Sequence, residues 1–272
     1  MKRFIKFVSR SGPLRVLKRL ILAFQYLLPS LSRSFSWALK KSEDSNFYYG
    51  LTERNFRHLM HFVAGVTAKS PSQILEYMEE LQTSSKYTEA VEKFRSRNKD
   101  QSGTTMEPGR RLGWYALIRA LKPKVVLETG VHQGVGALAI CLALEKNAAE
   151  GHLASYVGTD INPKAGGLIA ELGFSFATVL IGDSIDSINQ LTDQIDIYIS
   201  DSDHSEGYEF DELIAASNKL SKSALVISDN AHATDVLENW SISEGRQFSF
   251  FGERPKNHWY PGAGIGLSSP RI

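Results

Sequence analysis

The sequence predicts an α/β protein in which an α-helical N-terminal extension precedes a doubly wound, seven-stranded, mostly parallel sheet. Two observations predict this fold class. From residue 111 onward, short apolar runs alternate with helical segments, whereas the residues before it show helical spacing and polar stretches. We therefore divide the 272 residues into a basic amphipathic segment at 1–40, a helical cap region at 41–110 and an α/β domain at 111–272.

Residues 1–40 carry nine Lys or Arg and no acid, which leaves 22 basic and 30 acidic residues in the rest of the chain. One stripe at helical spacing is apolar and contains Leu14, Leu17, Ile21, Phe24 and Leu28. The uncharged run from Leu20 to Ser32 is interrupted by Pro29 and is too short to span a bilayer. Three interpretations stay open: peripheral contact of residues 1–35 with an anionic membrane, packing on the α/β domain or a second subunit, and a cleavable targeting segment.

The cap region predicts two helices, one capped by Thr52 and covering 55–63, the other beginning near Ser72. The polar stretch 96–110 suits a loop. Cys141 is the chain's one cysteine and lies in an apolar stretch, so we expect a buried thiol that packs as a small hydrophobe. An internal disulfide is excluded, which fits a reducing, cytoplasmic location, and the net charge of +1 gives no sign of a nucleic-acid partner.

Five apolar runs in the α/β domain predict parallel strands, and two later runs predict strands that complete the sheet. The five lie at 125–127, 156–158, 178–181, 195–200 and 224–228, and the last two at 248–251 and 265–267. In such a sheet, ligands bind beyond the carboxyl ends of the strands. The residues that follow each run are therefore the candidate site.

The first two strand ends predict a site for a small polar ligand. Glu128 ends the first run, and Gly130 and Gly134 allow a sharp turn and close approach of a ligand to the backbone. A carboxylate there would repel a pyrophosphate and suits an amino group or a cation. Asp160 follows the second run, where it can accept hydrogen bonds from ribose hydroxyls. The alternatives are a tight turn for the glycines and a helix cap for Asp160.

The third strand end leaves two interpretations open. Asp183 and Ser184 follow it, and either could bond an adenine amino group or cap the next helix.

The fourth and fifth strand ends carry the most distinctive group. Asp201, Asp203 and His204 follow the fourth run, and Asp229 and Asn230 follow the fifth. Asp201, Asp229 and Asn230 offer oxygen ligands of the kind that suit Mg²⁺. A bound ion would lower the pKa of a substrate hydroxyl, and His204, oriented by Asp203, would accept its proton. The alternative is that these acids cap the following helix.

These motifs resemble those of the class I S-adenosylmethionine (SAM)-dependent methyltransferases, which have a Rossmann-like fold. The stretch Leu127–Gly134 is similar to their first motif, which holds the methionine part of SAM, and Asp160 matches their ribose-binding acid. The closer resemblance is to the metal-dependent O-methyltransferases of the catechol, caffeoyl-coenzyme A and macrocin types. In those enzymes, acidic and amide residues after strands 4 and 5 hold Mg²⁺, and Asp201, Asp229 and Asn230 stand at the matching positions of this chain. In the catechol enzymes a lysine base stands where this chain has His204.

The resemblance implies a metal-assisted O-methyltransferase with SAM and Mg²⁺ as cofactors. Its acceptor would be a small molecule such as a sugar, polyketide, phenolic or lipid-linked compound, as in natural-product biosynthesis. Two other functions stay open: methyl transfer without a metal, and a non-catalytic scaffold that binds SAM or a membrane. A homo-oligomer is compatible with all three.

Overall fold

A computed structural model describes residues 12–39, 48–97, 107–229 and 231–271. Its sheet has seven strands in the order β3-β2-β1-β4-β5-β7-β6. Strands β1 to β5 pair in parallel, and β7 runs antiparallel between β5 and β6. This confirms the predicted fold class. The strand bounds are β1 Val125–Thr129, β2 Ser155–Asp160, β3 Ala177–Ile181, β4 Ile195–Ser200, β5 Leu220–Ser228, β6 Gln247–Gly252 and β7 Gly264–Ser269.

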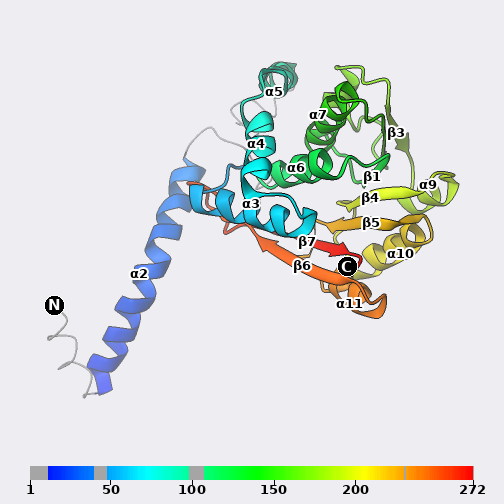
Figure 1. Ribbon diagram of the computed structural model, residues 1–272. Coiled ribbons are helices and arrows are strands. Elements are labelled where there is room, and N and C mark those ends of the chain that lie inside the picture. Colours follow the sequence, from blue (N-terminus) through cyan, green and yellow to red (C-terminus); the bar gives the residue numbers. More distant parts are fainter. Residues whose placement is uncertain (1–11, 40–47, 98–106, 230, 272) are drawn as a thin grey trace.

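Helices cover both faces of the sheet (Figure 1). Helices α6 (Arg111–Leu121) and α7 (Val135–Ala149) lie on one face, and α9 (Ser184–Gln190), α10 (Glu206–Ser217) and α11 (Val236–Ser243) lie on the other. Successive strand residues point to opposite faces, so Val126 joins the α6 and α7 core while Leu127 joins the α9 to α11 core. Burial on both faces explains why the strands read as continuous apolar runs. Cys141 is fully buried in the first core, as predicted.

Three helices of the cap region pack beside α6 and α7. They are α3 (Glu53–Thr67), α4 (Pro71–Gln82) and α5 (Ser85–Arg97), and the short helix α8 (Gly167–Ala170) contacts α5. Thr52 caps α3, as predicted, by accepting the backbone N–H of Asn55. The cap of α4 is Ser70 instead of Ser72, because Pro71 suits the first helical position and Ser70 can then accept the N–H of Gln73.

The start of the cap region is joined to the end of the sheet. The Asn55 side chain donates to the Gly252 carbonyl at 3.0 Å and accepts the Arg254 backbone N–H at 2.8 Å. The Thr52 N–H donates to the Arg254 carbonyl, and the Lys256 N–H donates to the Gly50 carbonyl at 2.7 Å. Segments about 200 residues apart in sequence therefore form one wall of the molecule.

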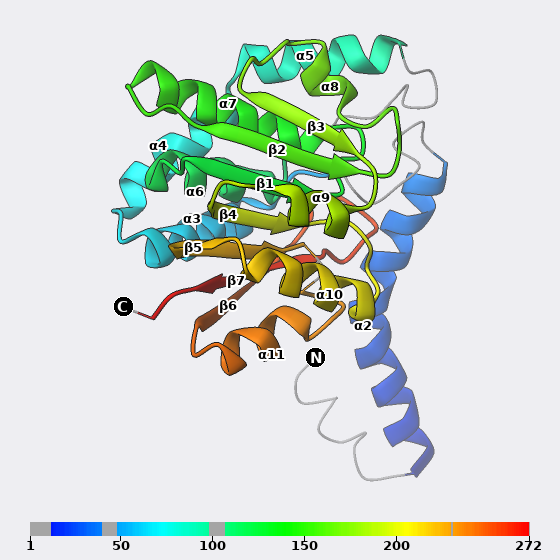
Figure 2. The same ribbon diagram turned by 90° about the vertical axis from the view of Figure 1, so that its right-hand side faces the viewer.

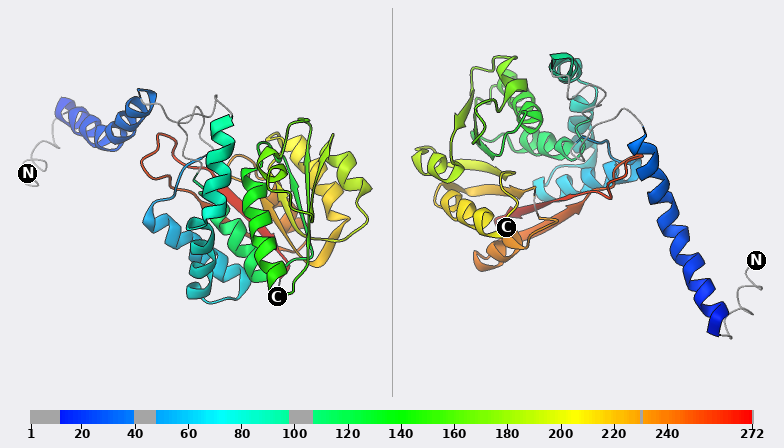
Figure 3. Two further views of the ribbon diagram at one scale, coloured as in Figure 1. Left: turned by 90° about the horizontal axis from the view of Figure 1, so that it is seen from above. Right: turned by 180° about the vertical axis from the view of Figure 1, so that it is seen from behind.

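Helix α2 (Gly12–Ala38) extends away from the body, and none of its residues is buried (Figures 1 and 3). Pro29, which interrupts the uncharged run in the sequence, lies inside this helix and does not end it. The carbonyl that loses its helical partner there faces an exposed surface, where water can bond it. In the part of the chain that the structure describes, no helix is both long and apolar enough to cross a membrane.

Candidate active site

A pocket of about 900 Å³ lies at the carboxyl ends of the parallel strands. It is lined by most of the side chains that the sequence predicted, namely Glu128, Gly130, Asp160, Asp183, Ser184, Asp201, Asp203, His204 and Asp229. Gly134 lies beside the pocket, where it precedes α7 with a φ of 92°. Asn230 lies outside the described residues, so its predicted role stays a prediction.

Gly130 brings the ends of β1 and β4 into close contact. Its φ is 79°, a left-handed conformation that favours glycine, and its N–H donates to the Thr159 carbonyl at 2.9 Å. A side-chain carbon at this position would overlap the backbone carbonyl of Asp201. The turn predicted from Gly130 therefore has a steric cause, and it leaves the backbone beside the pocket bare for a ligand.

Glu128 is buried at the end of β1 and accepts a hydrogen bond from the Tyr156 hydroxyl. Burial raises the pKa of Glu128 to about 8, even though the bond from Tyr156 and the charge of Arg111 oppose the rise. The carboxyl is thus mostly neutral near pH 7 in the ligand-free protein. A cation that enters the pocket would favour its ionised form, which matches the amino group expected of the ligand.

Asp160 connects the loops that follow β1 and β2. One carboxylate oxygen accepts the His132 backbone N–H at 2.7 Å, and the other accepts that of Asn162, also at 2.7 Å. Asp160 caps a turn here and not a helix. A carboxylate offers about four acceptor positions, so acceptor capacity remains on the pocket side. The predicted ribose contact is compatible with this arrangement.

Asp183 and Ser184 both serve the protein's own structure. Asp183 is the N-cap of α9, accepting the N–H groups of Ile185 and Asp186, and it also accepts the Tyr208 hydroxyl at 3.0 Å. The Ser184 hydroxyl donates to Glu212 at 2.5 Å. Of the two interpretations that the sequence left open for these residues, the structure shows helix capping for Asp183 and an internal hydrogen bond for Ser184. Both still line the pocket.

The Arg110 guanidinium lies at the metal site that the sequence predicted. Asp201 and Asp229 meet as expected, because β1, β4 and β5 end in register, and their carboxyl groups are hydrogen-bonded to each other. The Arg110 guanidinium donates from Nε and Nη2 to the two oxygens of Asp229. Its Nη1 also donates to Glu253 at 3.1 Å. Both Asp229 oxygens are therefore committed to a cation that the chain itself supplies.

This arrangement shifts the pKa values of Asp201 and Asp229 in opposite directions. Burial first, and then the neighbouring Asp229, raise the pKa of Asp201. Burial acts in the same direction on Asp229, but the Arg110 charge and hydrogen bonds outweigh it and hold the pKa of Asp229 low. The described atoms therefore do not fit a divalent ion bound between Asp201 and Asp229. Among the described residues, no group of three or more His, Cys, Asp or Glu has a metal-binding arrangement.

His204 and Asp203 lie at the open mouth of the pocket, and both are exposed. The Asp203 carboxylate accepts the Ser205 backbone N–H at 2.8 Å, a bond that lowers the pKa of Asp203. Asp203 thus closes a turn just before α10, whose N-cap is Ser205, and its role in orienting His204 stays a prediction. The imidazole of His232 also lines the pocket, with Nδ1 3.2 Å from the Asp229 carbonyl oxygen.

Several residues of the site were not found from the sequence. Tyr48, Arg110, Arg111 and Ala263 line the pocket from outside the predicted strand ends. Beneath it, Glu212 of α10 is fully buried and accepts hydroxyl hydrogen bonds from β1, β4 and α9. The sequence did contain a signal for Glu212. Several strands end in a residue with a hydroxyl group, and buried hydroxyl groups need a hydrogen-bond acceptor nearby.

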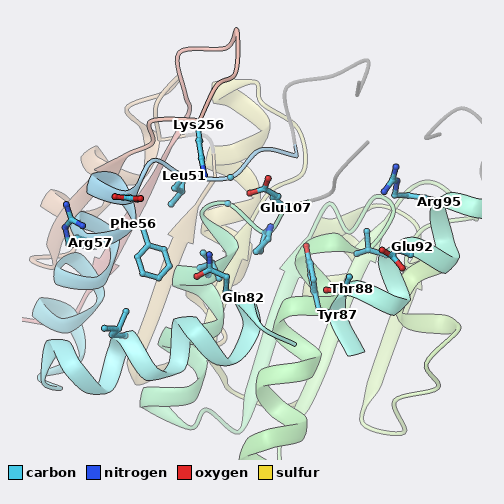
Figure 4. A pocket seen from close by; sticks show the side chains of 17 residues that line it. Leu51, Phe56, Arg57, Gln82, Tyr87, Thr88, Glu92, Arg95, Glu107 and Lys256 are labelled. Atoms are coloured by element: carbon cyan, nitrogen blue, oxygen red, sulfur yellow. The ribbon is translucent and has the colours of Figure 1, made fainter. Parts of the chain in front are cut away.

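A second cavity of about 780 Å³ lies between the cap helices and the segment that precedes α6 (Figure 4). Its labelled side chains come from α3, α4, α5 and three connecting segments: Leu51, Phe56, Arg57, Gln82, Tyr87, Thr88, Glu92, Arg95, Glu107 and Lys256. It contains none of the residues predicted for the site. The pocket at the strand ends is therefore the candidate active site.

Comparisons with known proteins agree with this placement. Residues 127–231 match the family model of a methyltransferase domain, Methyltransf_24. A search of curated proteins finds no significant match. Among solved structures, a methyltransferase from Geobacter sulfurreducens is 19% identical with a TM-score of 0.52, covering 74% of this chain and 98% of that one.

Two other similar structures were solved with the cofactor or its product bound. The O-methyltransferase TomG from Streptomyces achromogenes, in complex with SAM, is 15% identical with a TM-score of 0.50 and covers 70% of this chain and 91% of that one. An O-methyltransferase from Bacillus cereus, in complex with SAH (S-adenosylhomocysteine), is 11% identical with a TM-score of 0.52 and covers 72% and 97%. At these identities the likeness shows the fold. Residues 127–231 are therefore similar to a methyltransferase domain, and the sheet that carries them has the fold of these solved methyltransferases.

Proposed function

We propose that this protein transfers the methyl group of SAM to a hydroxyl oxygen of a small-molecule acceptor. One observation carries the proposal. In a single pocket, the Gly130 and Asp160 loops meet a wall that contains His204, His232 and Tyr260. The two loops suit a nucleoside with an amino acid attached. The imidazoles of the wall are available to accept a proton from the acceptor hydroxyl. The O-methyltransferases of similar fold support this reaction class.

In this proposal each side chain has a stated task. SAM supplies an electrophilic methyl group on its sulfonium. Asp160 receives the ribose hydroxyls, and Glu128 faces the amino group. His204 accepts the hydroxyl proton of the acceptor, which is a sugar, polyketide, phenolic or lipid-linked compound. Most of the acceleration comes from positioning of the two reactants.

The reaction that we propose requires no divalent metal. The guanidinium of Arg110 already balances Asp229 and holds both of its oxygens. The sequence favoured a metal-assisted reaction because the same acids looked unpaired. Arg110 supplies a fixed positive charge at this rim without an ion.

The reaction is tested with SAM that carries a tritiated methyl group and a panel of hydroxylated acceptors, each with and without EDTA. We expect transfer to persist with the chelator. His204→Ala should lower kcat by about 100- to 10,000-fold, the usual contribution of a general base. His152→Ala is the matched control, since His152 is exposed near the start of β2, at the opposite edge of the sheet. SAH binding without transfer to any acceptor would favour a scaffold, and activity that EDTA abolishes and Mg²⁺ restores would favour the metal.

The Gly130 turn gives a second expected result. Gly130→Ala should weaken SAH binding by about 100-fold, because its side chain would push the ends of β1 and β4 apart by roughly 1 Å. Isothermal titration with SAH measures this. The control is Gly207→Ala, where an added carbon meets nothing within 4 Å. Equal affinity of the Gly130→Ala variant and the unchanged protein would show that the turn does not shape the cofactor site.

A further inference from the structure

Helix α2 lacks the packing that the other long helices have. It is 27 residues long and buries none of them, whereas α3, α4, α5, α6 and α7 each bury several residues in the body. The side chains of Phe24, Leu28 and Phe35 are 47%, 55% and 69% exposed. Helix formation in water depends mostly on packing of an apolar face. The described part of the chain offers α2 no such cover.

The two faces of α2 differ sharply in chemistry. At 3.6 residues per turn, one side carries Leu17, Leu20, Phe24, Leu28, Leu31 and Phe35. The opposite side carries Arg15, Lys18, Arg19 and Arg33, with Leu22 and Tyr26 among them. No Asp or Glu occurs between Gly12 and Ala38. A broad apolar face opposite one whose charged residues are all cationic is the pattern of a helix that lies in a membrane interface.

The absence of acidic residues also helps to decide whether a second copy of α2 or a lipid bilayer covers the apolar face of the helix. Helices that pair with each other commonly place acidic and basic residues beside their apolar seam. Two copies of α2 could form no such ion pair, because the segment holds cations alone. An anionic bilayer satisfies both faces at once, since it takes the apolar side chains and attracts the cations.

Helix α2 meets the body beside the candidate active site. The rings of Trp37 and Trp259 lie 5.1 Å apart between centroids, and Trp259 contacts Tyr260, which lines the pocket. The arrowheads of the parallel strands β1 to β5 in Figure 2 point toward the side of the molecule on which α2 lies. A surface bound by α2 would therefore be on the pocket side of the sheet.

We propose that α2 is an interfacial helix that binds an anionic lipid bilayer and holds the pocket side of the protein near its surface. The binding does not depend on the proposed function. The test uses the full chain and vesicles of phosphatidylcholine with or without phosphatidylserine, separated by sedimentation. We expect binding only to vesicles with phosphatidylserine, and weaker binding at high salt.

Charge reversal separates this proposal from general electrostatic attraction. The variant R15E/K18E/R19E should bind the anionic vesicles on the order of 100-fold more weakly. The variant K69E/K146E/K222E makes the same change in net charge at exposed positions of the body, and its binding should change little. Because α2 buries no residue and the control positions are exposed, the melting temperature and SAH affinity of both variants should match the unchanged protein. A loss of vesicle binding can therefore be told apart from a loss of methyl transfer.

The proposal is overturned if the unchanged protein fails to sediment with anionic vesicles, or if R15E/K18E/R19E sediments as well as the control variant. It is also overturned if sedimentation velocity without lipid shows a dimer that L20D/F24D dissolves, because α2 would then be covered by a second copy.

Discussion

Arg110→Met is expected to lower the free energy of unfolding by about 3–5 kcal/mol, the usual effect of removing one partner from a buried ion pair. The Arg110 side chain is 6% exposed, and the side chains of its partners Asp229 and Glu253 are 4% and 0% exposed. Without it, two carboxylates lose their cation and several hydrogen bonds at once. For a chain of this size the melting temperature should fall by roughly 6–20 °C, which calorimetry measures directly.

Arg97→Met provides the matched control. Arg97 pairs with Glu171 at 2.8 Å, but its side chain is 57% exposed, so solvent screens the pair and its loss should cost about 1 kcal/mol or less. Arg110→Lys keeps one charge without the two-pronged geometry, and we expect an intermediate stability. A melting temperature of Arg110→Met close to that of the control variant would show that the acids do not need this cation.

Glu212→Ala is expected to destabilise the protein by at least about 4 kcal/mol, because it leaves buried hydroxyl groups without their acceptor. One oxygen accepts from Thr129 at 2.9 Å, Tyr198 at 2.7 Å and Ser200 at 3.0 Å, and the other from Ser184 at 2.5 Å and Ser202 at 2.8 Å. These donors come from the ends of β1 and β4 and from the start of α9. Chemical denaturation with urea gives the change in free energy.

Two further variants separate the carboxylate from the helix that carries it. Glu206→Ala changes an exposed residue in the first turn of α10 and should cost well under 1 kcal/mol. Glu212→Gln retains one acceptor oxygen, and rotation of the hydroxyls should recover part of the stability. If Glu212→Ala were no less stable than Glu206→Ala, the five hydroxyl bonds would have no net importance for the fold.

The sheet could be predicted because its determinants are local in the sequence. Buried parallel strands need apolar residues on both faces, so Val125–Leu127 and Ile195–Ser200 stand out as runs, and the polar residue after each run marks the site edge. Register then places Asp201 beside Asp229 without further information. A local pattern does not fix where α2 ends, because Pro29 interrupts the uncharged run in the sequence but lies inside the exposed helix.

The partners of the site residues were less accessible. Arg110 lies in a stretch without periodicity and pairs with residues 119 and 143 positions away, so no spacing rule connects them. A carboxylate that looks free in sequence can equally await a metal or an arginine, because both satisfy the same oxygens. Asp183 and Ser184 show the same ambiguity, since capping and ligand binding use the same polar atoms.

The hydrogen bonds that join the start of the cap region to the end of β6 and the segment after it can form only late in the synthesis of the chain. Thr52 and Asn55 bond to Gly252 and Arg254, so the cap region cannot complete its hydrogen bonds until the last two strands exist. At typical rates of synthesis the ribosome needs roughly 10–40 s to add the intervening residues. During that time the polar groups of Thr52 and Asn55 that bond to Gly252 and Arg254 in the folded protein have water as their partner.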